Sequence, residues 1–448
     1  MSRPTPPRAD PARQAAYRVL RRVSGEGAYA NLALSHEAAG LSPRDAGFAT
    51  ELTFGTCRAL GSYDAILQAV SKRPIGELDP PVLDLLRLGC HQLLAMRVPQ
   101  HAAVNSTVAL ARAELGPRVT GFVNAVLRKV AGDTLAGWLE LLSAGADPRD
   151  ALALATHHPR WIVDAWAAAL GEPDQAELRE ALAADNQAPV NHLVVRPGLA
   201  EVAELGGQPA RYSPYGAYLS GAPGAVPAVA EGRAGVQDEG SQLVALALSR
   251  VEAPDGPWLD LCAGPGGKAG LLAGLAIQAG TRLVASELQP HRARLVAQNL
   301  AGYASAEPAG RPVTLIADGT RPAWSPGSFA RVMADVPCTG LGALRRRPEA
   351  RWRRQPSDVA ALTGLQADLL RSALASARPG GVVAYVTCSP HLAETREVVA
   401  TATDAELLRA ADYLPEVPDA AVGDFVQLWP HRHGTDAMFL ALLRKPSS

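Results

Sequence analysis

The spacing of hydrophobic residues separates the chain into two kinds of sequence. From Arg13 to about Val130, apolar residues recur every three or four positions, as in amphipathic helices. The predicted helices are 12–23, 46–59, 82–96, 101–115 and 120–130. Ser42 and Asp45 are suitable caps for the second of these, and Pro99 ends the third. The short connections between them predict an all-helical bundle.

After about Val236 the pattern changes to short apolar runs that alternate with helical stretches. The predicted strands are 258–261, 283–286, 313–316, 331–334 and 382–386. Two later runs, 425–428 and 438–443, are expected to add an antiparallel pair. Strands that alternate with helices predict an α/β fold with a doubly wound, Rossmann-like parallel sheet.

The region between these two parts has a mixed pattern. Helical stretches at 135–142, 147–157, 161–170 and 174–184 are broken by Pro and Gly, and strands are predicted at 191–196 and 217–219. The first ten residues are rich in Pro and Arg, which favours disorder. We therefore predict four parts: a disordered tail at 1–12, a helical domain at 13–135, a linker domain at 136–234 and an α/β domain at 235–448.

A glycine-rich turn lies between the first strand of the α/β domain and its helix, in the sequence WLDLCAGPGGKAGLLA. Such a turn lets a ligand lie against bare backbone at the positive end of a helix. Gly264, Gly266 and Ala269 match the spacing of a dinucleotide-binding turn. The turn is not a P-loop. A P-loop has glycine at the position of Cys262, and it has Ser or Thr at the position of Ala269, directly after the lysine.

Reactive side chains end or follow four of the predicted strands: Glu287, Asp318, Asp335 and Cys388. Since the carboxyl ends of parallel strands share one edge of a sheet, we expect these side chains to meet at a ligand site. Glu287 would hold the ribose hydroxyls of either NAD or S-adenosylmethionine. Cys338 follows Asp335 closely, so two cysteines are expected at adjacent strand ends.

Two neighbouring thiols suit the methylation of cytosine at C5. Cytosine C5 is a poor nucleophile, but a thiolate that adds to C6 makes C5 enamine-like, so that it attacks a methyl sulfonium. An acid near N3 assists this addition, and a base must then remove the C5 proton so that the thiolate can leave. An NAD-dependent oxidoreductase would use one cysteine and leaves the second unexplained.

Composition narrows the class of protein further. The 448 residues have a net charge of −1, but residues 1–130 contain 16 Lys and Arg against 10 Asp and Glu. This basic bias leaves the helical domain open as either an RNA-binding or a docking module. The five cysteines form no C-x-x-C pair, which argues against zinc and against disulfides. No signal peptide or membrane-spanning run is apparent, so we expect a cytoplasmic protein without a membrane partner or a metal.

Several motifs together give a family resemblance. The α/β domain resembles RNA 5-methylcytosine methyltransferases of the Nol1/Nop2/Sun family. The motifs are VQDEGSQ (236–242), LDLCAGPGGK (259–268), ADG (317–319), DVPCTGLG (335–342), RRRPEARW (345–352), YVTCS (385–389) and LWPHRHGTDAMF (428–439). The helical domain, with GTCR (55–58) and GFVNAVLRKV (121–130), resembles the NusB-like RNA-binding domain, and HHPRW (157–161) resembles the linker between the two.

The resemblance implies roles for individual residues. Cys388 would add to C6, Cys338 would assist release of the methylated base, and Asp335 would contact the cytosine edge with Lys268 nearby. S-adenosylmethionine would be bound by Cys262, Ala263, Gly264, Pro265, Gly266, Gly267, Lys268, Glu287, Asp318 and Asp335. The sequence departs from the family in AGPGGKA, where AAPGGKT is more common, and at Ala437, where Gly is usual. The first is a mild change at a helix N-terminus, and the second touches no proposed catalytic group.

Arginines crowd around Trp352 just after Cys338. A charge run is usually a solvated surface, but this one contains six arginines and one glutamate, which favours a surface that follows RNA phosphates. The arginines predicted to bind RNA are Arg345, Arg346, Arg347 and Arg351. His431 and His433 have no partner at ligand spacing, so no metal is predicted there.

The sequence thus predicts methyl transfer from S-adenosylmethionine to C5 of a cytidine in small-subunit rRNA. The helical domain and the linker would select the RNA. Three alternatives stay open: a tRNA substrate with the same chemistry, a non-catalytic RNA-binding factor in assembly or antitermination, and an NAD-dependent oxidoreductase. The target base must be flipped out or unpaired, because C5 and C6 are inaccessible within a stack.

Overall fold

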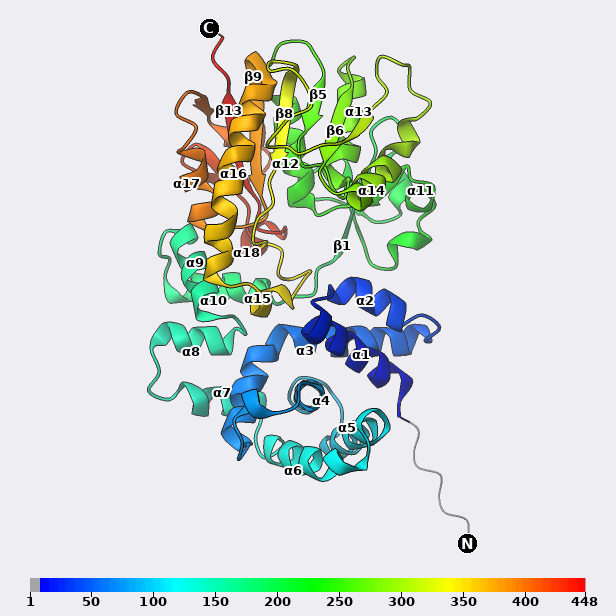
Figure 1. Cartoon of the computed structure of the whole chain (residues 1–448), viewed down its shortest axis with the longest axis vertical. Coiled ribbons are helices and arrows are strands. Elements are labelled where there is room, and N and C mark those ends of the chain that lie inside the picture. The colour runs from blue at the N-terminus through cyan, green and yellow to red at the C-terminus, as the bar shows by residue number, and fades with distance from the viewer. Residues whose placement is uncertain (1–8, 448) are drawn as a thin grey trace. The chain divides into compact units, whose positions relative to one another are not determined.

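The computed structural model describes residues 9–447, which form two compact units (Figure 1). Unit 1 contains residues up to Asp164, with Gln175–Asn186 and Arg346–Arg354, and unit 2 contains Ala165–Asp174, Gln187–Arg345 and the residues from Gln355 onward. Both the linker predicted at 136–234 and helix α9 (Arg160–Leu170) are divided between the units. The predicted tail at 1–12 lies mostly outside the described residues, although its last two residues begin helix α1.

Unit 1 is helical, as the apolar spacing predicts. Its helices are α1 (Pro11–Glu26), α2 (Ala30–Glu37), α3 (Pro43–Val70), α4 (Pro80–Leu94), α5 (Gln100–Leu115), α6 (Thr120–Val130), α7 (Leu135–Ser143), α8 (Pro148–Ala155), α10 (Gln175–Ala184) and the short α15 (Ala350–Arg353). The Asp10 carboxylate caps α1 by accepting from the backbone N–H of Arg13, and the Ser42 hydroxyl caps α3 in the same way. Leu52, Ile66, Leu85 and Leu127 are among its fully buried core residues.

Helix α3 is longer than the predicted 46–59 because Gly61 is a packing position and does not end the helix. At Gly61, a Cβ atom would lie 2.2 Å from Cζ3 of Trp352, so only glycine leaves room for that indole. The Trp352 Nε1–H donates to the carbonyls of Cys57 and Arg58 at 2.8 and 3.2 Å. The segment 346–354 is therefore held inside unit 1 although it lies far away in sequence.

Arg351 fixes the same segment from within. Its guanidinium is fully buried, donates to the His157 carbonyl and the Asn186 side chain at 3.0 and 2.6 Å, and lies 3.5 Å from the Asp185 carboxylate. The Asp185 carboxylate also pairs with His158 Nε2 at 3.0 Å. Burial and the Arg351 charge lower the pKa of His158 to about 4 and that of His157 to about 3.

Unit 2 begins with a small antiparallel sheet in the order β2-β3-β1-β4. Its strands are β1 (Asn191–Val195), β2 (Gln208–Pro209), β3 (Gly216–Leu219) and β4 (Ala234–Val236), with the short helix α11 (Pro227–Ala230) before β4. The predicted strands at 191–196 and 217–219 are confirmed as β1 and β3. Helix α12 (Glu239–Arg250) follows and leads into the main sheet.

The main sheet has nine strands in the order β11-β12-β13-β9-β8-β5-β6-β7, with β10 paired to β13. They are β5 (Trp258–Asp260), β6 (Leu283–Glu287), β7 (Val313–Ile316), β8 (Phe329–Asp335), β9 (Ala377–Thr387), β10 (Glu406–Leu408), β11 (Ala421–Val422), β12 (Phe425–Gln427) and β13 (Phe439–Arg444). Strands β9, β8, β5, β6 and β7 run parallel to one another, and β13 is antiparallel to β9 and β12. Every strand predicted for the α/β domain is present, and so is the antiparallel pair.

Helices cover the sheet with two separate apolar clusters. Helices α12, α13 (Gly267–Gln278) and α14 (Pro290–Leu300) contribute to one cluster, while α16 (Pro356–Ser376) and α17 (Arg396–Val399) contribute to the other. The remaining helix of the unit is the short α18 (Pro430–His433). The α/β expectation is thereby confirmed, since buried parallel strands need cover on both faces. No helix among residues 9–447 is long and apolar enough to cross a bilayer.

Candidate active site

Two thiols meet at the carboxyl edge of the parallel sheet. Cys338 follows β8 and Cys388 follows β9, and these two strands are direct parallel neighbours. The two Sγ atoms lie 3.4 Å apart, within hydrogen-bonding distance, and both side chains are only partly buried. The expectation that the strand ends bring these residues together is therefore confirmed.

The two thiols differ in acidity. The hydrogen bond from Cys338 lowers the pKa of the Cys388 thiol below its usual value, against the opposing effects of burial and of Asp335, and Lys268 lowers it further. The same hydrogen bond, together with burial, raises the pKa of Cys338. Since the thiolate is the nucleophilic form of cysteine, these opposite pKa shifts favour Cys388 as the candidate nucleophile.

An ion pair lies beside the thiols. Lys268 Nζ, at the start of α13, lies 2.9 Å from Asp335 Oδ2, at the end of β8. Burial acts to lower the pKa of Lys268, but Asp335 outweighs it and the pKa is raised. Burial and the charge of Asp335 raise the pKa of Asp260 to about 8, so this acid, which the sequence analysis overlooked, holds a proton at neutral pH.

The turn between β5 and α13 is a cradle of bare backbone. Glu287 Oε2 accepts from the Gly264 N–H at 3.0 Å, and a Cβ atom on Gly264 would lie 2.1 Å from the same oxygen. Gly266 has a φ of +113°, and a Cβ there would lie 2.8 Å from the Cβ of Asn299. Arg292, from helix α14, donates to the Gly264 carbonyl, so a neighbouring helix also holds the turn in place.

A second carboxylate follows β7, the strand next to β6 in the sheet. Asp318 follows β7, and hydrogen bonds from Thr320 lower its pKa, so it stays ionised. One carboxylate against the glycine turn and a second after the neighbouring parallel strand, together with a helix N-terminus, fit a ligand that has ribose hydroxyls and an adenine ring. The remaining predicted cofactor residues, Cys262, Ala263, Pro265 and Gly267, belong to the same turn.

Comparison with known proteins agrees with this geometry. The profile of the 16S rRNA methyltransferase RsmB/F family matches residues 245–444, and that of the NusB family matches 10–132. A Mycobacterium tuberculosis protein named as a methyltransferase is 52% identical over 97% of both chains. Ribosomal RNA small subunit methyltransferase B of Pseudomonas putida is 34% identical, over 86% of this chain and 87% of its own. The chain belongs to the RsmB/F family of 16S rRNA methyltransferases.

Solved structures share the fold of this RsmB/F protein. The crystal structure of PH0851 superposes with a TM-score of 0.78, at 20% identity, over 98% of this chain and all of its own. NSun6 from Pyrococcus horikoshii has a TM-score of 0.53 at 18% identity, over 64% of this chain and 98% of its own. The RsmB/F protein is an RNA methyltransferase with S-adenosylmethionine as its cofactor, and the alternative of an NAD-dependent oxidoreductase is set aside.

Glu394 is a second residue of the RsmB/F site, besides Asp260, that the sequence motifs did not indicate. Glu394, in the short 3-10 helix Leu392–Glu394, is fully buried and accepts hydrogen bonds from both the N–H and the hydroxyl of Thr339. It also accepts from the Ser389 hydroxyl at 2.6 Å. Thr339 and Ser389 directly follow the two cysteines, so one carboxylate fixes both strand ends. Its position in the sequence, five residues after the end of the YVTCS motif, is the feature by which Glu394 could have been predicted as a site residue.

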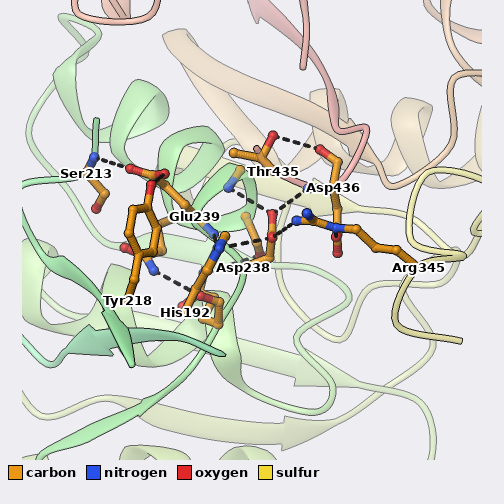
Figure 2. Close-up of polar contacts among 12 residues, drawn as sticks. His192, Ser213, Tyr218, Asp238, Glu239, Arg345, Thr435 and Asp436 are labelled. Carbon is orange, nitrogen blue, oxygen red and sulfur yellow. Dashed lines mark hydrogen bonds and ion pairs between the residues drawn. The ribbon is translucent and has the colours of Figure 1, made fainter. Parts of the chain in front are cut away.

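The arginines after Cys338 have different surroundings in this RsmB/F chain. Arg345 and Arg351 are buried in ion pairs, so the exposed position expected of them is wrong for these two (Figure 2 shows Arg345). Arg347 is exposed and lies over the ring of Tyr29 within unit 1. RNA binding by Arg346 and Arg347 stays a prediction. His433 is buried, with its two ring nitrogens 2.8 and 3.0 Å from backbone atoms of Trp429 and Pro418.

Proposed function

We propose that this RsmB/F methyltransferase methylates C5 of a cytidine in small-subunit rRNA through a covalent bond between Cys388 and C6. The observation that supports this most is the thiol pair at 3.4 Å, in which Cys388 is the more acidic partner. Methylation of an exocyclic nitrogen or a ribose oxygen would need no thiol, whereas C5 chemistry needs one to activate the ring.

The first step is addition of the Cys388 thiolate to C6. A sulfur–carbon bond forms, the C5=C6 π electrons move to C5, and the ring is stabilised by hydrogen bonding along its N3–C4 edge. Asp335 would accept from the exocyclic amino group at that edge. Lys268, at 2.9 Å, holds the Asp335 carboxylate in place and balances its charge in a partly buried site.

Bound S-adenosylmethionine supplies an electrophilic methyl group on its sulfonium. After transfer, a base takes the C5 proton, the C5–H electrons restore the C5=C6 bond, and the Cys388 thiolate leaves. Cys338, whose thiol remains protonated because its pKa is raised, would donate a hydrogen bond to the departing sulfur. This gives the second cysteine a role in release.

The cofactor would lie along the cradle that starts after β5. The backbone of residues 262–267 and the N-terminus of α13 would hold its methionine and sugar, Glu287 the ribose hydroxyls, and Asp318 the adenine side. The absence of side chains at Gly264 and Gly266 lets Glu287 and Asn299 pack directly against the turn, which holds the Glu287 carboxylate beside its backbone.

Selection of rRNA would come from unit 1, which contains the NusB-family region. Residues 1–130 have an excess of basic over acidic side chains, which suits contact with phosphates. Arg346 and Arg347 would add to this surface from the segment 346–354.

Methyl transfer from labelled S-adenosylmethionine to protein-free small-subunit rRNA, with total tRNA alongside, tests the proposal. We expect label in the rRNA alone, recovered after digestion as 5-methylcytidine. Label in tRNA would overturn the substrate and keep the chemistry. Label recovered as any other nucleoside would overturn the chemistry. If neither naked RNA accepts label, partly assembled small subunits are the next substrate to test.

A further inference from the structure

Arg345 joins two buried carboxylates beside the active site. Its Nε lies 2.7 Å from Asp436 Oδ1 and its Nη2 lies 2.9 Å from Asp238 Oδ2 (Figure 2). All three side chains are less than 10% exposed. A forked guanidinium that binds two carboxylates through different nitrogens holds both at a defined distance, which a lysine cannot do.

The two aspartates belong to segments far apart in the chain. Asp238 caps α12, where its Oδ1 accepts from the Gly240 N–H at 2.9 Å, and the same oxygen accepts from the Asp436 N–H at 3.0 Å. His192, from β1, lies 3.3 Å from the other oxygen of Asp238. The cluster therefore connects the start of α12, the segment before β13 and the loop that ends at Arg345.

That loop is the one on which Cys338 lies. Midway between Cys338 and Arg345, the Gly342 N–H donates to the Cys388 carbonyl at 2.9 Å, and the Gly342 carbonyl accepts from the Ala437 N–H at 2.8 Å. A Cβ on Gly342 would lie 2.1 Å from the Ala437 oxygen, so the two backbones are as close as glycine permits. The residue after Asp436 is thus in direct backbone contact with the thiol loop.

We propose that Arg345 is a positioning residue for the two thiols: through Asp436 and Asp238 it fixes the loop that places Cys338 against Cys388. The inference rests on the proposed function, since it names what sets the geometry of the same site. It replaces the role in RNA binding that the arginine-rich sequence favoured for Arg345.

The same cluster affects the charge around Cys388. The groups that face this thiol are Cys338, Asp335, Lys268 and Asp436, of which the two carboxylates oppose thiolate formation. Arg345 balances the Asp436 carboxylate at 2.7 Å. Loss of Arg345 would remove the positive charge that it contributes at this carboxylate, so Cys388 would ionise only at higher pH. Loss of the Asp436 charge would instead let Cys388 ionise at lower pH.

Alkylation of the full-length protein by iodoacetamide across a pH series, with peptide mass spectrometry of Cys388, tests this without RNA. We expect Arg345→Met to move the pH midpoint of Cys388 alkylation upward, Asp436→Asn to move it downward, and Arg345→Lys to restore part of the shift. Arg347→Met, which removes an exposed arginine of the same run, serves as the control and leaves the midpoint unchanged.

Turnover gives the second readout. Because small misplacement of reacting groups costs about 10²-fold, we expect Arg345→Met to lower kcat by that order while the KM for S-adenosylmethionine stays within about threefold. If Arg345→Met unfolds the protein, the buried Cys57 becomes alkylated as well. The alkylation midpoints of Asp436→Asn and Arg345→Lys then test the inference in its place. Unchanged midpoints in Arg345→Lys and Asp436→Asn would overturn the inference. A wild-type protein that methylates no RNA would overturn the proposed function and leave the alkylation result standing.

Discussion

The cysteines of the helical unit and those of the sheet edge differ in their burial, in their hydrogen-bond partners and in the charges near them. Cys57 and Cys90 are fully buried among apolar side chains, and burial raises the pKa of both thiols. Cys338 and Cys388 are partly exposed, lie within hydrogen-bonding distance of each other, and have Lys268 nearby. A cysteine at the end of a parallel strand, with a donor beside it, thus has surroundings that suit a nucleophile, whereas a cysteine in the helical core does not.

The largest expected effect is that of removing the nucleophile. Cys388→Ala should lower methyl transfer by at least about three orders of magnitude, because the ring is no longer activated at C6. Label transfer to RNA under single-turnover conditions measures this. Cys57→Ala in the helical unit is the matched control and should keep turnover within about threefold of wild type. Equal losses in both variants would contradict the contrast between the two regions.

Cys338→Ala should trap the reaction after methyl transfer, because the departing Cys388 thiolate loses its hydrogen-bond donor. We expect a covalent protein–RNA adduct that survives a denaturing gel, visible as a shifted band. Cys388→Ala gives no such band. If instead Cys388→Ala is the variant that shifts, the two cysteines have the opposite roles.

Acidification should affect the helical unit through its buried histidines. His157 and His158 have pKa values lowered to about 3 and about 4, so the unfolded chain binds their protons at higher pH than the folded chain does. Stability is therefore complete above about pH 6.5 and is lost as the pH falls toward 4, by about 1.4 kcal/mol per pH unit for each histidine.

Urea unfolding of the full chain at a series of pH values measures this loss. His158→Gln should reduce the slope by the contribution of one proton, whatever it does to stability at pH 7. A slope that His158→Gln leaves unchanged between pH 6.5 and 4 would show that this histidine is not the group responsible.

The smallest effect concerns the polarity of the two thiol environments. Cys57→Ser places a hydroxyl in an apolar, fully buried position and should cost about 1–3 kcal/mol of unfolding free energy. Cys338→Ser, at the partly exposed edge, should cost less than about 1 kcal/mol. Thermal or urea unfolding compares the two, and a larger loss for Cys338→Ser would mean that the edge is as apolar as the core.

Periodicity located the parallel strands and most of the helices, because these strands are short and largely apolar and these helices have an apolar side. The edge residues Glu287, Asp318, Asp335 and Cys388 could be predicted for the same reason, since topology alone brings strand ends together. The glycine turn could also be predicted, because another group can approach the backbone closely only where the residue is glycine.

What could not be predicted depends on contacts between distant segments. Nothing in the run of arginines distinguishes Arg345 and Arg351, which are buried, from Arg347, which is exposed. Their carboxylate partners lie about a hundred or more residues away or in another motif. The role of a glycine is equally ambiguous in sequence. Gly61 suggests the end of a helix, whereas in the structure it makes room for the Trp352 side chain.

The enclosed segment 346–354 constrains how this protein can be divided. A fragment that starts at residue 187 would keep Trp352 and Arg351 but lose Gly61 and Asp185, the groups that accommodate them. A fragment that ends at 186 would leave the Asp185 carboxylate with His158 but without the Arg351 guanidinium, and removal of one partner from a buried ion pair is destabilising. Exchange of the NusB-like region between relatives would therefore have to include these nine residues from the C-terminal half of the chain.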